Sequence, residues 1–490
     1  MEWVLKNGRL CACALICVFG LAVFAARVPA QTGGQGSAHS IQALFVSDIH
    51  FEPFWDPGKA AQLAKAPVAE WGKILDSQAT EGRPEAFTAL QKQCHARGID
   101  ANFAVYESSL RAMHERAATA RFVIVSGDLI AHDFACKFAA VFPKAAPGEY
   151  RAFVEKTLDY VLTQLRATLS GVPVYAGLGN NDSDCGDYQL DANGVFLRES
   201  GKLFAADLRG AERAQAVETF AAGGHYSVRL PEQIEHARLL VLDDVFMAER
   251  YAACSGKPDA APAAAQLAWL KQQLGEAREK KEKLWVMAHI PPGVNAYSTA
   301  TKGKSFCATG KPTMFLSSEA LPEILTANGD VIRLTIFGHT HMDEMRLLAP
   351  AKESATAKPV AVKVVASISP VDGNNPSFTL ATVDPETATL MDYRVIAASN
   401  QTGEDTTWNE EYDFAQTYHE PAFTAAALTD LIAGFTADRF AQKAASESYL
   451  RNYMTGVDLR GLAIIWHPYA CSLDNETAEA YTGCACHGTP

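Results

Sequence analysis

The sequence lacks several features that mark common classes of protein. Its formal net charge is −13, so it has no broad basic face for a phosphate backbone, and we expect no general nucleic-acid binding. After residue 30 no apolar run reaches the roughly 20 residues that span a bilayer. No Cys-x-x-Cys pair is present, which disfavours a structural zinc site built on thiolates. No internal repeat or strongly biased segment interrupts the chain, and we expect an ordinary globular protein.

The N-terminus has the layout of a secretory signal peptide. Lys6 and Arg9 precede an apolar run from Leu10 to Ala26, and Val28-Pro29-Ala30 forms a small-residue cleavage site before Gln31. An uncleaved membrane anchor is the alternative, but the run is short for a span. We therefore expect a signal peptide over residues 1–30 and an exported protein, extracellular or periplasmic, with no transmembrane anchor after cleavage. Residues 31–40, rich in Gly, Gln and Ser, read as a flexible leader.

Cysteine use agrees with export. Three of the eleven cysteines lie in the predicted signal peptide, and an even number remains, which is typical of disulfide bonding in exported chains. The sequence does not determine which cysteines pair, although Cys484 and Cys486, which are separated by one residue, should take different partners. The remaining cysteines are Cys94, Cys136, Cys185, Cys254, Cys307, Cys471, Cys484 and Cys486.

From Ile41 onward, short β-rich apolar runs alternate with longer helical patterns, which predicts a layered α/β or α+β domain. A catalytic-size domain over 41–400 is followed by a tail, 401–490, that we expect to be helical, with helices at 422–435 and 438–455. A hairpin is predicted from 378–383 and 389–396. The strand-like runs are 41–47, 121–126, 172–177, 237–243, 284–288 and 331–337, and the helical patterns are 105–120, 150–169 and 263–281.

Five of the six strand-like runs are followed directly by side chains that can bind a metal ion. Buried strands are rigid, and the loops at their ends can converge on one crevice. A lone Asp, Asn or His after a strand is usually a turn or surface residue, but that explanation does not account for the recurrence. These candidate metal ligands are Asp48, His50, Asp128, Asn180, His289, His339 and His341.

The set of side chains restricts the kind of ion. It offers carboxylate, amide and imidazole groups but no thiolate, which suits zinc best, with manganese or iron as alternatives. Seven ligands are too many for one ion with an open position, and they fit two ions roughly 3.5–4 Å apart that share a carboxylate. Gly127, Gly179 and Gly338 precede ligands, where glycine lets the backbone turn and approach an ion closely.

These motifs resemble the five blocks of the calcineurin-like metallophosphoesterase superfamily, in its order. The resemblance implies a four-layer αββα sandwich in which two mixed β-sheets lie between helices. It also implies a division of the ligands between two metals. Asp48, His50 and His341 would hold the first metal, Asn180, His289 and His339 the second, and Asp128 would bridge them.

Within that superfamily the chain is similar to the acid sphingomyelinase and sphingomyelinase-like phosphodiesterase branch. The block from Asp128 to Asp133, which contains His132, and the segment 367–378 carry this similarity, and the cysteine-bearing tail resembles that branch's C-terminal subdomain. The resemblance implies a phosphodiester substrate and hydrolysis by a hydroxide that bridges the metals.

One position departs from the family pattern. Asn181 stands where related enzymes commonly have a histidine that helps the leaving group, and an amide can donate a hydrogen bond but cannot supply a proton. Either His132 is the acid, because imidazole titrates near neutral pH, or the substrates are phosphoanhydrides, whose phosphate leaving group needs little protonation. A catalytic role is therefore expected for His132 and Asn181, without a choice between these alternatives.

Nearby acids receive weaker predictions. Asp133, Asp182 and Asp343 are expected to fix histidine tautomers, and Asp184 and Asp187 are expected to be solvated loop acids. Taken together, the sequence predicts a secreted two-metal phosphodiesterase that takes a phosphate ester or anhydride substrate. A polyphosphate or nucleotide hydrolase of the same superfamily is one alternative, and a non-catalytic secreted protein that binds metal or phosphate is another.

Overall fold

The computed structural model describes residues 40–301, 305–309, 311–350, 356–457 and 460–487. The predicted signal peptide and nearly all of the predicted leader lie outside these residues. The described chain from residue 40 onward belongs to one compact unit.

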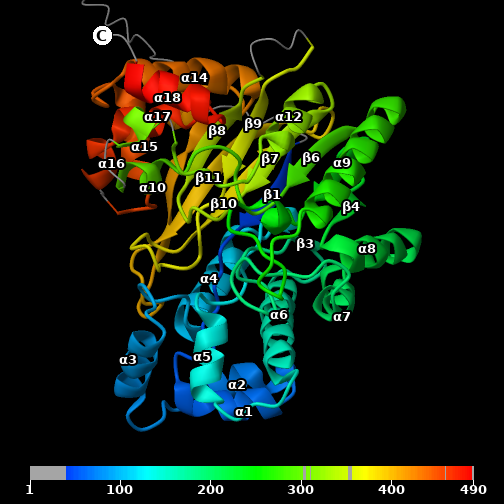
Figure 1. The fold of residues 1–490 in the computed structure, drawn as a ribbon, viewed down its shortest axis with the longest axis vertical. Coiled ribbons are helices and arrows are strands. Elements are labelled where there is room, and N and C mark those ends of the chain that lie inside the picture. Colours follow the sequence, from blue (N-terminus) through cyan, green and yellow to red (C-terminus); the bar gives the residue numbers. More distant parts are fainter. Residues whose placement is uncertain (1–39, 302–304, 310, 351–355, 458–459, 488–490) are drawn as a thin grey trace, which may run out of the picture. The chain divides into compact units, whose positions relative to one another are not determined.

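The first sheet has the strand order β12-β11-β10-β1-β2-β3 (Figure 1). Strands β1, β2 and β3 run parallel, whereas β10, β11 and β12 continue the sheet with antiparallel pairs. It is therefore a mixed sheet. Its strands are β1 (Ile41–Val46), β2 (Ala120–Val125), β3 (Val174–Ala176), β10 (Ser377–Val383), β11 (Leu390–Ala398) and β12 (Trp408–Asp413).

The second sheet has the order β4-β5-β6-β7-β9-β8. Strands β5, β6, β7 and β9 are parallel, and an antiparallel strand closes each edge. This sheet is mixed as well. Its strands are β4 (Tyr226–Arg229), β5 (Ala237–Val241), β6 (Lys283–Met287), β7 (Ile332–Phe337), β8 (Glu344–Leu348) and β9 (Val360–Val364).

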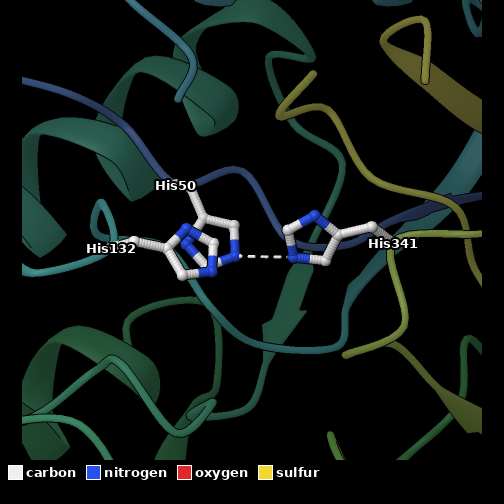
Figure 2. A group of neighbouring side chains, drawn as sticks. All are labelled: His50, His132 and His341. Carbon is white, nitrogen blue, oxygen red and sulfur yellow. Dashed lines mark hydrogen bonds between the residues drawn. The ribbon is translucent and has the colours of Figure 1, made fainter. Parts of the chain in front are cut away.

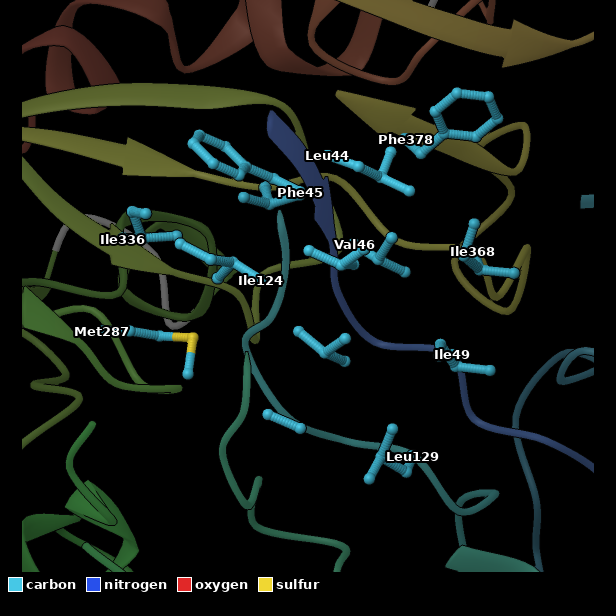
Figure 3. Close-up of a cluster of buried hydrophobic side chains, with 14 of the residues drawn as sticks. Leu44, Phe45, Val46, Ile49, Ile124, Leu129, Met287, Ile336, Ile368 and Phe378 are labelled. Atoms are coloured by element: carbon cyan, nitrogen blue, oxygen red, sulfur yellow. The ribbon is translucent and has the colours of Figure 1, made fainter. Parts of the chain in front are cut away.

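The two sheets pack face to face over a core to which alternate residues contribute. Because successive side chains of a strand point to opposite faces, Trp285 and Met287 of β6 join the cluster between the sheets, while Leu284 and Val286 join a second cluster. Phe45 of β1 meets Trp285 edge to face, with ring centroids 5.9 Å apart. Figure 3 shows part of this cluster around β1. Both faces of the central strands are therefore buried, which explains why they read as continuous apolar runs.

Helices cover the outer faces. Asn102 caps α4 by accepting a hydrogen bond from the backbone of Val105 at 3.0 Å, and Pro262 lies in the first turn of α9, where a missing N–H costs nothing. The helices before β6 are η1 (Pro57–Lys59), α1 (Ala60–Lys65), η2 (Val68–Glu70), α2 (Trp71–Asp76), α3 (Arg83–Gln93), α4 (Phe103–Arg116), α5 (Phe134–Val141), α6 (Glu149–Thr168), α7 (Val195–Phe204), α8 (Gly210–Gly223), η3 (Asp244–Met247) and α9 (Ala261–Lys280).

The helices after β6 include those of the C-terminal tail. Helix α14 contacts β8 and β9, and its neighbours in the tail gather beside it (Figure 1). These helices are α10 (Ala296–Thr301), α11 (Ser305–Thr309), α12 (Ala320–Ala327), α13 (Phe414–Tyr418), α14 (Ala425–Ala437), α15 (Ala444–Asn452), α16 (Arg460–Ile464), α17 (Trp466–Cys471) and α18 (Ala478–His487).

The fold class predicted from the sequence is confirmed. All six strand-like runs lie on strands, and the three helical patterns and the hairpin are present. Strands β4, β8, β9 and β12 were not expected. Residues 408–413, predicted to belong to a helical tail, form β12 because they pair with β11. The division at residue 400 stays a prediction.

All eight cysteines that follow the predicted signal peptide are paired. The pairs are Cys94–Cys136, Cys185–Cys254, Cys307–Cys486 and Cys471–Cys484. Cys484 and Cys486 take different partners, as expected. Within the described ranges, no helix combines the length and the apolar character that a membrane crossing requires.

Candidate metal centre and active site

The register of the strands aligns the ends from which the candidate ligands emerge. Val46 at the end of β1 pairs with Val125 at the end of β2, and Val125 pairs with Ala176 at the end of β3. In the second sheet, Met287 at the end of β6 pairs with Ile336 of β7. The loops after these parallel strands therefore leave the sheets at the same edge, where open α/β sheets commonly bind ligands.

The loops bring carboxylates and imidazoles from both sheets into contact. Nε2 of His289 lies 3.2 Å from Oδ2 of Asp128, and Nε2 of His50 lies 3.4 Å from the same oxygen. Nε2 of His341 lies 3.4 Å from Oδ1 of Asp48. The Nε2 atoms of His50 and His341 are 3.1 Å apart, and Figure 2 shows their rings facing one another. All five side chains are buried.

The donor atoms separate into overlapping groups that fit two ions. The ligand atoms of Asp48, His50 and Asp128 lie within 4.8 Å of one another, and so do those of Asp128, His289 and His339. Asp128 is common to both groups. This arrangement accords with the predicted bridging role of Asp128.

Asn180 presents an acceptor that the protein does not use. Its Nδ2 donates a hydrogen bond to Oδ1 of Asp187 at 2.7 Å, whereas its Oδ1 is buried without a hydrogen-bond partner among the described residues. Leaving a buried acceptor unpaired costs free energy, and a cation would satisfy it. The residues present therefore fit a metal site.

Backbone carbonyl groups fix the tautomers of two of the histidines. Nδ1 of His50 lies 2.9 Å from the carbonyl oxygen of Ile130, and Nδ1 of His289 lies 2.8 Å from that of Ser126. A carbonyl oxygen only accepts, so each Nδ1 carries a proton, and Nε2 is the nitrogen that can bind a metal once a second proton has left. This orientation is the usual one for imidazoles that bind metals.

The acids expected to fix tautomers have other contacts. Asp182 accepts hydrogen bonds from the backbone N–H groups of Leu129, Ile130 and Gly179, and so joins two ligand loops. Asp343 contacts Lys363 and Tyr412. The side chain of Asp133 makes no cap hydrogen bond to α5. The prediction that Asp182 and Asp343 fix histidine tautomers was therefore wrong. Backbone carbonyl groups, which sequence patterns do not reveal, fix the tautomers of His50 and His289.

Five of the seven candidate ligands have left-handed backbone conformations. The φ values are 46° for Asp48, 45° for His50, 54° for Asp128, 71° for His339 and 64° for His341. Such conformations are uncommon for residues other than glycine and cost about 1–3 kcal/mol each. They persist only where the surroundings enforce them, and such strain gathers at functional sites.

The glycines before the ligands permit close approach, as predicted. A Cβ atom on Gly179 would lie 2.1 Å from Oδ1 of Asp128, and one on Gly338 would lie 2.0 Å from Oγ of Ser47. Gly127 has a φ of 102°. A larger residue at position 179 would displace the carboxylate and backbone of Asp128, and one at position 338 would displace the side chains of Ser47 and Asp48.

The electrostatics of the cluster favour ionised carboxylates. Burial acts to raise the pKa of Asp48, but contacts with His50 and His289 outweigh it and lower the pKa to about 2. Burial acts to lower the pKa of His289, but the Asp128 carboxylate prevails and raises it to about 10. Burial lowers the pKa of His339 to about 3. Anionic carboxylates and neutral imidazoles are the forms that bind cations, so a metal must displace the proton of His289.

Comparison with known families agrees with this geometry. The chain matches the family described as calcineurin-like phosphoesterase over residues 41–343. The chain belongs to this family. It is therefore a phosphoric ester hydrolase by descent, and the resemblance inferred from its motifs is confirmed. The family uses a dinuclear metal centre, for which the chain supplies candidate ligands.

The relatives are phosphodiesterases of the sphingomyelinase-like branch. The acid sphingomyelinase-like phosphodiesterase 3b of Homo sapiens is 22% identical over 458 residues, which cover 90% of this chain and 89% of that protein. The Homo sapiens protein named cyclic GMP-AMP phosphodiesterase SMPDL3A is 27% identical over 291 residues, covering 58% of this chain and 60% of that protein. A solved dimetal phosphatase from Danio rerio has a TM-score of 0.40 at 11% identity, over 76% of this chain and 99% of that one.

His132 lies at the edge of the cluster of candidate ligands. Its ring stacks on that of His50 with centroids 3.9 Å apart (Figure 2). Its Nδ1 lies 2.9 Å from Oδ1 of Asp100, and its backbone N–H donates to Oδ2 of Asp100 at 2.8 Å. The His132 side chain is 34% exposed. The ring is therefore both oriented and accessible.

Asn181 contacts the carboxylate that the two donor groups share. Its backbone N–H donates to Oδ1 of Asp128 at 2.8 Å, and its side-chain Nδ2 donates to Oδ2 at 2.9 Å. His289 and His50 outweigh burial and hold the pKa of the Asp128 carboxyl well below its usual range, and the backbone N–H of Asn181 adds to this effect. Contact between Asn181 and a phosphoryl oxygen stays a prediction.

Several supporting residues were not recognised from the sequence. The hydroxyl of Tyr188 lies 3.2 Å from Nε2 of His339. Asp187, expected to be a solvated loop acid, is 39% exposed and in addition orients the Asn180 amide. Oδ1 of Asp244 accepts the backbone N–H groups of His289 and Ile290, each at 3.1 Å. Asp244 follows the run 237–243, the one run of the six that was not assigned a ligand, so extending the strand-end argument to that run would have found it.

Proposed function

We propose that the chain is an exported, metal-dependent phosphodiesterase that hydrolyses phosphodiester bonds at a centre for two divalent cations. Zinc is the favoured ion, with manganese or iron as alternatives, because the donors are oxygen and imidazole nitrogen without thiolate. The observation that carries the proposal is the position of Asp128, whose Oδ2 lies 3.4 Å from His50 and 3.2 Å from His289. A carboxylate placed between two imidazole groups suits a bridge between ions.

The ligands would divide as the family resemblance implies. When bound, two divalent cations neutralise charge on phosphoryl oxygens and lower the pKa of a water molecule, so that it can lose a proton and attack phosphorus. The protein holds the sites ready through the carbonyl contacts of His50 and His289, the Asn180–Asp187 hydrogen bond and the left-handed ligand backbone. One site would take Asp48, His50 and His341, the other Asn180, His289 and His339, with Asp128 in both.

His132 is the proposed proton donor. Hydrolysis adds water across a P–O bond, so the attacking water loses a proton and the departing alkoxide must gain one. Asp100 accepts the Nδ1 proton of His132, which leaves Nε2 to face the leaving oxygen. The buried Asp100 carboxylate holds the ring in this orientation, as the acidic member of a catalytic triad does.

A phosphoanhydride substrate is the second candidate, and the observation that favours it is Asn181. The amide is bonded to Asp128 and can donate a hydrogen bond but no proton, which suits a phosphate leaving group. A protein that binds metal or phosphate without turnover would keep the same ligands.

A reconstitution experiment separates these functions. The mature chain is freed of metal, loaded with zinc, manganese or iron, and assayed for bound metal and for hydrolysis of bis(p-nitrophenyl) phosphate and tripolyphosphate. We expect about two ions per chain and turnover of the diester. Two bound ions without hydrolysis of either compound would establish the non-catalytic function. Export is tested by N-terminal sequencing of the secreted product, which should begin at Gln31.

A further inference from the structure

Arg250 presents a fixed cation beside the proposed metal centre. It follows η3 and its side chain is 69% exposed. Its guanidinium carbon lies 4.3 Å from the centroid of the Tyr188 ring, within the range of a cation–π contact. Its Nη2 lies 3.4 Å from Oδ2 of Asp187. The guanidinium therefore packs with one face on the Tyr188 ring and contacts the Asp187 carboxylate with one edge.

Both residues that hold Arg250 also contact proposed ligands of the second metal. The Tyr188 hydroxyl lies 3.2 Å from Nε2 of His339, and Oδ1 of Asp187 accepts a hydrogen bond from Asn180. Only one side chain thus separates the Arg250 guanidinium from each of these two ligands. The guanidinium is therefore connected to the proposed second metal site through Tyr188 and through Asp187.

The segments that carry Tyr188 and Arg250 are fastened together. A disulfide joins Cys185 to Cys254, and the backbone of Ala252 exchanges hydrogen bonds with this loop, donating to the carbonyl of Tyr188 at 3.1 Å and accepting from Leu190 at 3.3 Å. Arg250 lies in the segment between Cys185 and Cys254 that this disulfide closes. A preorganised cation loses little conformational freedom when an anion binds.

The charges on the rim of the centre differ from side to side. Asp372, whose side chain is 55% exposed, places Oδ2 3.3 Å from Nδ1 of His341 on the side of the first proposed metal. Arg250 lies on the side of the second. Asp187 contacts the guanidinium through Oδ2 alone, at 3.4 Å, while its Oδ1 accepts a hydrogen bond from Asn180. Among the described contacts, Arg250 pairs with no other acid.

We propose that Arg250 binds a second anionic group of the substrate, one linkage away from the scissile phosphorus. A guanidinium matches phosphate with paired N–H donors, so the group is the neighbouring phosphate of a phosphoanhydride, in a nucleotide or in inorganic polyphosphate. A cationic substituent such as choline is disfavoured at the same place. This inference rests on the proposed function and selects among its substrates.

The test compares substrates of different charge in Arg250→Ala and Arg250→Glu variants loaded with saturating metal. The substrates are ATP, tripolyphosphate, bis(p-nitrophenyl) phosphate and p-nitrophenyl phosphorylcholine. Relative to the nitrophenyl diester, kcat/KM for the polyanions should fall about 10-fold in Arg250→Ala, mainly through KM, and further in Arg250→Glu. The choline ester should gain relative to the diester in Arg250→Glu. Where a polyanion is not cleaved, its inhibition constant against the diester gives the same comparison.

The two anionic compounds distinguish the sources of the second phosphate. If the substitutions lower the relative kcat/KM for ATP alone, the second phosphate belongs to a nucleotide. If they lower it for both ATP and tripolyphosphate, Arg250 recognises the phosphate chain itself. Arg111→Ala is the matched control, because Arg111 on α4 is 62% exposed and pairs with Glu107 at 2.8 Å. Arg111→Ala should leave the kcat/KM of each substrate, relative to that of the nitrophenyl diester, unchanged.

Equal effects of Arg250→Ala on all substrates, or none, would overturn the role of Arg250 while leaving the phosphodiesterase function intact. A wild-type protein that binds two ions but cleaves no diester would instead overturn the proposed function, and the dissociation constants of ATP and tripolyphosphate, measured by calorimetry on wild type and Arg250→Ala, would still report on Arg250. Metal content measured for each variant excludes an indirect loss through His339 or Asn180.

Discussion

Asp100 holds His132 at two points, since one oxygen of its carboxylate accepts the backbone N–H at 2.8 Å and the other lies 2.9 Å from ring Nδ1. Asp100 is itself buried and accepts a hydrogen bond from Oγ of Ser369 at 2.9 Å. The imidazole is thus oriented before a substrate arrives. A ring that is fixed, accessible and backed by a carboxylate has the geometry of a general acid.

Replacing His132 should therefore affect substrates according to their leaving group. In His132→Ala, hydrolysis of an alkyl phosphodiester should fall by about 10²–10⁴, because alkoxide departure requires a proton. Hydrolysis of a nitrophenyl ester should fall far less, since nitrophenolate leaves without one. Steady-state kcat/KM on the two esters measures the difference. Asp100→Asn should show the same selectivity more weakly, and equal losses on both esters would exclude the acid role.

Replacing Asp128 should remove metal and activity together. In Asp128→Asn the shared carboxylate is lost, and we expect bound metal to fall from about two ions per chain and diester hydrolysis to fall by at least about 100-fold. Elemental analysis and the bis(p-nitrophenyl) phosphate assay measure both. Asp430→Asn, which changes an exposed carboxylate on α14, should alter neither. Undiminished turnover in Asp128→Asn would refute the two-metal centre.

Replacing Gly179 with alanine should disturb the same carboxylate without altering a ligand. The new Cβ would lie 2.1 Å from Oδ1 and 2.4 Å from the backbone nitrogen of Asp128, so the loop after β3 must move. We expect reduced metal content and at least about 10-fold lower activity, by analogy with changes around metal ligands.

Gly275→Ala is the control for the glycine substitution. Gly275 lies in α9 with no atom within 4 Å of an added Cβ. There alanine should raise the free energy of unfolding by up to about 1 kcal/mol, because it favours a helix. Full metal content and activity in Gly179→Ala would show that the close approach is not required.

The candidate ligands could be found in the sequence because each lies in the loop that follows its strand. Asp48 after β1 and His289 after β6 require only the strand and the next few residues to be read correctly. Their convergence follows from the parallel order of the strands. Supporting residues such as Asp100 and Tyr188 escape this reasoning, because they reach the centre through contacts that no local pattern records.

The unexpected strand β8 has a different cause. Its sequence contains Glu344 and Arg346, which read as polar, yet both are buried and form an ion pair at 2.7 Å. A charge that is neutralised inside the protein masks the apolar pattern on which strand prediction depends. In β12 the exposed Asn409 and Glu410 have the same effect beside the buried Trp408.

Glu476, a carboxyl group outside the set of candidate ligands, should make the stability of the fold depend on pH. Glu476, between α17 and α18, accepts a hydrogen bond from the backbone of Ala349 at 3.2 Å, and burial raises its pKa from 4.5 to about 8. The folded state therefore holds a proton that the unfolded state releases, so the stability of the fold falls as pH rises from about 4.5 to about 8. Above that range the contribution levels off.

Glu476→Gln should remove this part of the pH dependence, because glutamine keeps an acceptor for Ala349 and does not ionise. Urea unfolding at several pH values, at fixed metal concentration, gives the free energy of unfolding of both proteins. The difference between wild type and variant should change steadily in favour of the variant from pH 5 to pH 8, while contributions from the metal centre cancel. Glu479→Gln, an exposed acid in the first turn of α18, should follow the wild type. Parallel curves for Glu476→Gln and wild type would mean that the Glu476 carboxyl ionises in the folded protein as readily as in the unfolded chain.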